Sequence, residues 1–192
     1  MKKHIFIING AAGSGKDTFI DCLIIAAKDM VEVGGIENYS SVSVIKDIAT
    51  QLGWDGAKNE KDRKFLSDLK LLCKEYNDLP FKHLIHTVSN FYKSLNDEFL
   101  FIHIREPEEI ERAKTAFGAK TILLKNPKTL PVESNTSDKN VYNYDYDIII
   151  NNDGSISDLR ELAPVFISDI CDNKLKPEYF ANIDRNFYYK YN

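Results

Sequence analysis

The sequence predicts a doubly wound α/β domain, in which a mainly parallel sheet carries helices on both faces. Short apolar runs rich in Ile, Val and Phe, each bounded by turn residues, alternate with segments whose apolar residues recur every three or four positions. Uninterrupted apolar runs are typical of strands that are buried on both faces, and their alternation with helices is typical of parallel sheets. Together these two observations give the fold class.

Five segments fit buried strands, which predicts a five-stranded sheet. They are residues 4–8, 39–44, 98–104, 121–124 and 146–150. The clearest helical pattern follows at 156–170, where Ser155 and Asp158 have the spacing of an N-terminal capping box. A second stripe of apolar residues at helical spacing runs from Phe65 to Tyr76.

Length and composition favour one compact globular domain over residues 1–192. Hydrophobic residues make up 43% of the chain and charged residues 28%, which excludes disordered and fibrous classes. The net charge of −4 argues against general attraction to nucleic acid or to anionic membranes. No apolar run approaches the roughly 20 residues of a membrane helix, and the first run is too short for a secretory signal.

The three cysteines predict a reducing compartment. Cys22, Cys73 and Cys171 lie far apart, and each falls in a helical apolar pattern without a neighbouring Cys or His. We interpret them as reduced core thiols, which predicts a cytoplasmic protein.

Two segments depart from the alternating pattern. Residues 125–145 contain Pro127, Pro131 and a polar stretch, so this connection is expected to be a mobile lid or a disordered loop. The chain from Lys176 onward is dense in aromatic residues. Packing of this tail against the domain, or against a second subunit in a homodimer, is favoured over a ligand site.

The segment after the first predicted strand carries the chemistry. It fits the phosphate-loop pattern G-x-x-x-x-G-K, placed between a strand and an apolar helix, and comprises Gly10, Ala11, Ala12, Gly13, Ser14, Gly15, Lys16, Asp17 and Thr18. Glycines let backbone N–H groups turn toward phosphates, and the helix N-terminus adds its dipole. We expect Lys16 to place its ammonium on the β and γ phosphates of ATP. A glycine-rich turn without a ligand is the alternative.

A known family shares the details of this loop. The common pattern has Ser or Thr directly after the lysine, whereas here Asp17 intervenes and the hydroxyl stands at Thr18. The loop thus resembles that of the nucleoside monophosphate kinases, G-x-x-G-x-G-K-x-[ST], and most closely the deoxynucleoside monophosphate kinase branch, where G-K-D-T is usual. Segments 101–110 and 144–159 are also similar to this branch. The resemblance spans about residues 2–170 and implies a three-layer P-loop NTPase fold, ATP and Mg²⁺ as cofactors, and Thr18 as a magnesium ligand.

Four further cationic residues are candidates for such a site: Lys46, Arg63 and Arg105 for binding the acceptor, and Arg105 and Arg112, with Lys16, for catalysis. Arg105 follows a predicted central strand at the sheet edge where ligands collect, and a guanidinium there binds phosphate bidentately; a structural salt bridge is the alternative. The resemblance places acceptor-binding helices at about 45–96, with Lys46 and Arg63 facing the acceptor, although both also fit solvated helix positions. Arg112 is a catalytic candidate by the resemblance, or an i,i+4 partner of Glu108.

The sequence departs from the family at two places. His103 stands where the family has an acid that helps to hold magnesium, and the expected lid contains Lys125, Lys128 and Lys139 but no arginine. The leading hypothesis is an ATP-dependent kinase of a nucleoside or deoxynucleoside monophosphate. Its expected partners are small-molecule nucleotides and a second copy of the chain, with neither a membrane nor nucleic acid among them. One alternative is a nucleotide-binding regulatory protein without turnover. Another is a kinase of a small phosphorylated metabolite, because animal-type phosphomevalonate kinases have a similar G-K-D loop.

Overall fold

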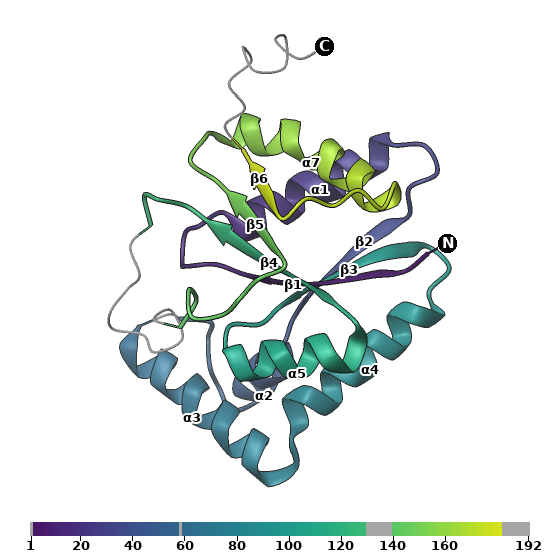
Figure 1. Ribbon diagram of the computed structural model, residues 1–192. Helices are drawn as coiled ribbons and strands as arrows, with labels where there is room; N and C mark the ends of the chain where they lie inside the picture. Colours follow the sequence, from purple (N-terminus) through teal and green to yellow (C-terminus); the bar gives the residue numbers. More distant parts are fainter. Residues whose placement is uncertain (1, 58, 130–139, 182–192) are drawn as a thin grey trace, which may run out of the picture. The chain divides into compact units, whose positions relative to one another are not determined.

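The computed structural model describes residues 2–57, 59–129 and 140–181. By its internal contacts the chain divides into two compact units, of which the first is Met1–Asn38 with Asn96–Asn192 and the second is Tyr39–Leu95. Within the described residues, the first unit contains nearly all of the sheet with helices α1, α5 and α7, and the second unit contains helices α2, α3 and α4. Figure 1 labels these elements.

A parallel sheet of six strands forms the centre of the first unit. The strands are β1 (His4–Asn9), β2 (Gly35–Ser40), β3 (Asp97–His103), β4 (Lys120–Lys125), β5 (Ile148–Asn151) and β6 (Glu178–Phe180), in the order β2-β3-β1-β4-β5-β6. Parallel pairing joins β1 to β3 and to β4, β4 to β5, and β5 to β6. The predicted α/β class is confirmed, with one strand more than expected.

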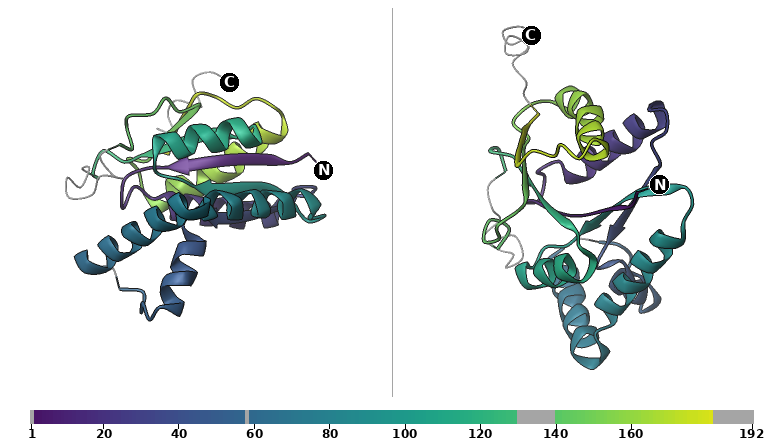
Figure 2. Two further views of the ribbon diagram at one scale, coloured as in Figure 1. Left: turned by 90° about the horizontal axis from the view of Figure 1, so that it is seen from below. Right: turned by 45° about the vertical axis from the view of Figure 1, so that its right-hand side comes forward.

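Helices cover both faces of this sheet (Figures 1 and 2). On one face α1 (Lys16–Asp29) and α7 (Ile156–Cys171) pack against each other, and on the other face α5 (Pro107–Phe117) contacts β1 and β4. Phe6 of β1 and Phe101 of β3 are paired in the register of the two strands, and their rings stack with centroids 5.2 Å apart. Both belong to the core formed with α1 and α7. The capping box predicted for the last long helix is present at the start of α7.

The second unit is helical and corrects one predicted strand. It contains α2 (Ser43–Gln51), α3 (Glu60–Asn77) and α4 (Leu79–Lys93). The strand expected at 39–44 is wrong in its bounds, because β2 ends at Ser40 and α2 begins at Ser43. Val44, Ile45 and Ala49 are buried at helical spacing, so the alternating Ser and Val residues open an amphipathic helix.

The apolar stripe predicted at 65–76 lies on α3 but is not part of a core. This helix has no buried residue, and the side chains of Leu72 and Tyr76 are 63% and 84% exposed. The cysteine prediction is also wrong in part. All three cysteines are free, but only Cys22 is buried, whereas Cys171 is exposed at the end of α7.

The start of the aromatic tail supplies the sixth strand. Tyr179 of β6 is buried, its ring meets Phe166 edge-on with ring centroids 5.1 Å apart, and its hydroxyl donates to Asp169. This part of the tail packs against the domain itself, which was one of the two alternatives expected for it. The aromatic residues from Phe187 onward lie outside the described residues. Among the described helices, none combines the length and apolar character needed to cross a membrane.

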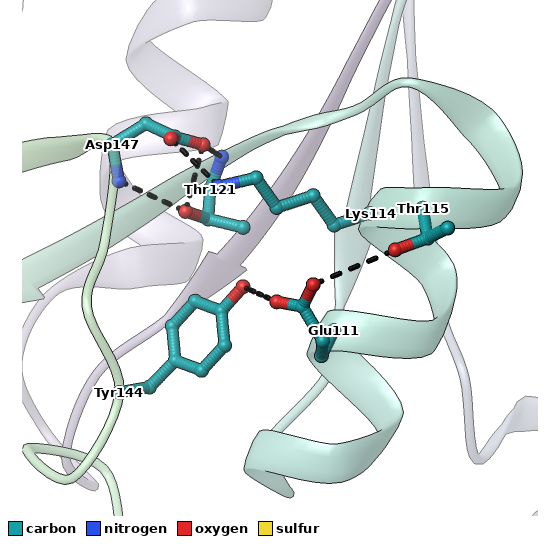
Figure 3. A network of polar contacts seen from close by, with 6 residues as sticks. All are labelled: Glu111, Lys114, Thr115, Thr121, Tyr144 and Asp147. Carbon is teal, nitrogen blue, oxygen red and sulfur yellow. Dashed lines mark hydrogen bonds and ion pairs between the residues drawn. The ribbon is translucent and has the colours of Figure 1, made fainter.

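A polar network attaches the chain before β5 to α5 and to the start of β4 (Figure 3). The Asp147 carboxylate accepts hydrogen bonds from the Thr121 amide at 2.8 Å and from the Lys114 ammonium at 2.7 Å. Tyr144 donates to Glu111 at 2.7 Å. Burial alone would raise the pKa of Asp147, but the hydrogen bonds from Lys114 and Thr121 outweigh it and hold the pKa below its ordinary value.

Replacing Asp147 should reveal this network in the pH dependence of stability. A carboxyl whose pKa is depressed by folding stabilises the native state above its unfolded pKa of about 4, and this contribution disappears as the pH falls below that value. Asp147→Asn should therefore lower the free energy of unfolding by about 1–2 kcal/mol at pH 7 and by less under acid. Urea unfolding over a pH series measures both effects. The exposed Asp145, changed to Asn, is the control, and an equal loss at every pH would contradict the prediction.

Candidate functional site

The predicted phosphate loop lies between β1 and α1. The strand ends at Asn9 and the helix begins at Lys16, so residues 10–15 form the connection. Gly13 and Gly15 have φ angles of 76° and 98°, a backbone conformation that residues other than glycine rarely adopt. Gly15 precedes the helix without a side-chain cap. The first N–H groups of α1 are thus presented at a helix N-terminus, where anions bind.

Lys16 folds its ammonium back over this loop. The Nζ atom donates to the carbonyl oxygens of Gly10 at 2.8 Å and Ala11 at 3.1 Å. The loop therefore holds a cation close to the N-terminus of α1, and a lysine ammonium beside a glycine-rich loop can bind phosphate groups.

Two buried asparagines hold the loop at its ends. Asn9 accepts from the Gly10 amide at 2.8 Å, and the Asn152 side chain donates to the Ser14 carbonyl at 2.8 Å. The sequence reasoning missed both residues. The sequence feature that could have indicated them is an asparagine at or directly after the end of an apolar strand. The contacts of Asn9 with Arg105 and of Asn152 with Ser14 join residues that lie far apart in the chain.

The hydroxyl of Ser14 is buried and has no hydrogen-bond partner within the described part of the chain. A buried polar atom without a partner costs about 1–3 kcal/mol, so such atoms are rare unless a ligand or water completes them. This atom lies inside the phosphate loop itself, which fits a loop that is completed by a bound group.

His103 lies beside the first turn of α1. Side chains alternate along β3, so His103 continues the row of Phe99 and Phe101 on the α1 face. Its Nε2 atom is 2.8 Å from Oδ1 of Asn38 and 3.8 Å from Oδ1 of Asp17. Within the described ranges, no group of three or more His, Cys, Asp or Glu side chains could hold a metal ion. Thr18, the expected magnesium ligand, is half-buried in the first turn of α1.

The arginine candidates of the first unit follow β3. Arg105 is exposed, and its carbonyl oxygen accepts from the Asn9 side chain at 3.1 Å, which fixes its backbone next to the start of the phosphate loop. Arg112 is exposed in α5, one turn after Glu108. Their catalytic and acceptor-binding roles stay predictions.

The other candidates belong to the second unit or to the expected lid. Lys46 and Arg63 are exposed on α2 and α3 of the second unit, and their acceptor-binding roles stay predictions. Lys125 ends β4, and Lys128 follows in a turn closed by its amide and the Asn126 side chain. Lys139 and the middle of the lid lie outside the described residues.

Comparison with known proteins supports a similarity of fold and no more. No family model matches the chain, and no curated protein matches it by sequence. Among solved structures, TT1252 from Thermus thermophilus is similar with a TM-score of 0.50 and 17% identity, over 88% of this chain and 98% of that chain. At this identity the likeness concerns the fold alone, and it agrees with the α/β architecture described above.

Two further structures have lower TM-scores. An unliganded sugar kinase from Janibacter sp. HTCC2649 has a TM-score of 0.45 and 14% identity, over 92% of this chain and 99% of that chain. A thymidylate kinase from Ehrlichia chaffeensis has a TM-score of 0.33 and 10% identity, over 99% of this chain and 98% of that chain. Because both scores lie below 0.5, neither adds weight to an argument about function.

Adding a methyl group at Gly15 should damage the loop beyond the cost of backbone strain. A Cβ atom there would lie 2.5 Å from the Asn152 amide nitrogen and push it off the Ser14 carbonyl. Gly118 is the matched control, because it also has a positive φ, in the same unit, with nothing within 4 Å of an added Cβ. In each Ala variant the added Cβ at positive φ costs roughly 1–2 kcal/mol, and Gly15→Ala should lose at least about 1 kcal/mol more. Equal losses in urea unfolding would contradict the clash.

Proposed function

We propose that this protein transfers a phosphoryl group from ATP to a nucleoside or deoxynucleoside monophosphate. The observation that carries the proposal is the loop of residues 10–15 at the N-terminus of α1. It combines positive-φ glycines, the Lys16 ammonium and the buried Ser14 hydroxyl, for which the described residues provide no hydrogen-bond partner. A strand, a glycine-rich loop, a lysine and a helix in this order bind the phosphates of a nucleotide. The resemblance of the G-K-D-T segment supplies the choice of acceptor.

The residues present fit ATP with magnesium. The N–H groups of the loop and of the first turn of α1 would hold the phosphates, Lys16 would neutralise the β and γ phosphates, and the Thr18 hydroxyl would bind the metal. Bound Mg²⁺ would neutralise charge that develops on the transferred group and keep several waters as ligands, so few protein ligands are needed.

Arg105 would hold the acceptor phosphate. It stands at the carboxyl edge of the sheet, next to β1, and its guanidinium matches the geometry of a phosphate. Arg112 would stabilise charge in the transition state, and Lys46 and Arg63 would contact the acceptor from the helices of the second unit. These roles rest on the family resemblance.

One observation favours a second candidate function. His103, held by Asn38 beside Asp17, replaces the family acid with an imidazole. Loss of that carboxylate weakens magnesium binding, which favours a nucleotide-binding regulatory protein without turnover. Tight ATP binding combined with the absence of acceptor-dependent turnover would select this function.

Removing the loop lysine should abolish ATP binding without unfolding the protein. The Lys16 ammonium donates to the loop carbonyls of Gly10 and Ala11, and Lys16 is not a member of the buried core. Lys16→Ala should therefore remove the charge opposite the phosphates and leave the core intact. Calorimetric titration with ATP and Mg²⁺ measures the affinity. Lys28→Ala, at the other end of α1, is the control and should bind ATP like the wild type. Wild-type affinity in Lys16→Ala would refute the loop assignment.

Removing Arg105 should impair the acceptor side alone. A charged hydrogen bond is worth roughly 1.5–3 kcal/mol, so Arg105→Ala should lower kcat/KM for the acceptor by about tenfold or more. ATP affinity should change little, and Arg160→Ala, an exposed arginine of α7, should leave both unchanged. Unaltered kinetics with a lowered melting temperature would instead make Arg105 a structural residue.

A further inference from the structure

Asn9 connects three separate segments of the first unit through one buried side chain. Only 1% of the residue is exposed. Its Oδ1 atom accepts from the Gly10 amide at 2.8 Å, and its Nδ2 atom donates to the Arg105 carbonyl at 3.1 Å and to the Tyr146 hydroxyl at 2.8 Å. Both N–H groups and the carbonyl oxygen are therefore used.

The partners allow the amide only one orientation. The Gly10 N–H can only donate, so it must face the oxygen of Asn9, and the Arg105 carbonyl can only accept, so it must face the nitrogen. Tyr146 donates its own proton to the Val141 carbonyl at 2.8 Å, which leaves a lone pair for Asn9. Burial raises the pKa of Tyr146 to about 12, so the hydroxyl keeps this proton at neutral pH. A flipped amide would lose the bonds to Gly10 and Arg105, and it could accept from Tyr146 only if that hydroxyl left the Val141 carbonyl.

We propose that Asn9 is a positioning residue, which fixes the backbone of Arg105 relative to the first N–H of the phosphate loop. This inference rests on the proposed phosphoryl transfer. Phosphoryl transfer depends on holding the donor phosphates and the acceptor at a fixed distance and in line, and small displacements reduce the rate strongly. In this chain the proposed ATP site begins at Gly10 and the proposed acceptor site includes Arg105. The side-chain amide of Asn9 is hydrogen-bonded to the backbone of both residues.

The substitution Asn9→Asp removes the hydrogen bond to the Arg105 carbonyl but keeps the one from the Gly10 amide. It keeps the shape and the oxygen that accepts from Gly10, but it places a second oxygen against the Arg105 carbonyl, where a donor is required. Asn152→Asp is the matched control. It adds the same charge beside the phosphate loop, through the contact with the Ser14 carbonyl, and Asn152 has no described hydrogen bond to Arg105. Both variants should weaken ATP binding through this charge, so acceptor kinetics are compared at saturating ATP.

A double-mutant cycle with Arg105→Ala tests whether Asn9 acts through Arg105. Asn9→Asp should lower kcat/KM for the acceptor by about tenfold in the wild-type background and by less than about twofold in the Arg105→Ala background. Asn152→Asp should have the same effect in both backgrounds. Equal effects of Asn9→Asp in the two backgrounds would overturn the proposal, because a residue that only stabilises the fold acts independently of Arg105.

A measurement without turnover separates this inference from the proposed function. In the full chain, Asn9→Asp should accelerate amide hydrogen exchange in residues 104–110 relative to Asn152→Asp, because the bond that restrains the Arg105 backbone is lost. Unchanged exchange in this segment overturns the positioning role. If wild-type protein binds ATP but phosphorylates no acceptor, the kinase function fails, and faster exchange still supports the link between Asn9 and Arg105.

Discussion

The central place of β1 in the parallel sheet is the constraint on which the site depends. β1 pairs with β3 on one side and with β4 on the other, in a register that sets Ile8 opposite His103 and Ile122. Parallel strands bring their carboxyl ends to the same edge of a sheet. The phosphate loop, which continues β1, is therefore flanked by the loops that follow β3 and β4. A slip by one residue would turn Phe6 and Ile8 away from α1 and α7, so the core on both faces fixes this register.

The same alternation of side chains delivers polar groups to the site. On the α1 face, the apolar rows of β3 and β5 end in His103 and Asn152, which lie next to the first turn of α1 and the phosphate loop. On the α5 face, the row of β1 ends in Asn9. The apolar part of each strand stabilises the sheet, and the next residue of the same row contacts the loop. The stability of the sheet and the geometry of the site thus both depend on the two-residue repeat by which side chains alternate between the faces of a strand.

Local patterns were sufficient for the features that arise locally. The phosphate loop, the capping box of α7 and four of the six strands follow from residue types at short spacing. The boundary between β2 and α2 was wrong, because four residues of alternating Ser and Val fit a strand and the first turn of a helix equally well. β6 has only three residues, and its burial depends on a contact between Tyr179 and Phe166 that no local pattern encodes. Asn9 and Asn152 were missed for the same reason, since their bonds join residues 96 and 138 positions apart.

The central claim is that the loop of residues 10–15 holds ATP for transfer of its terminal phosphoryl group. A coupled assay of ADP release tests it most directly, with ATP and Mg²⁺ and a panel of nucleoside monophosphates, deoxynucleoside monophosphates and small phosphorylated acceptors. The account predicts ADP release that depends on one class of monophosphate. Release that no acceptor stimulates, or none at all from a protein that binds ATP tightly, would contradict it.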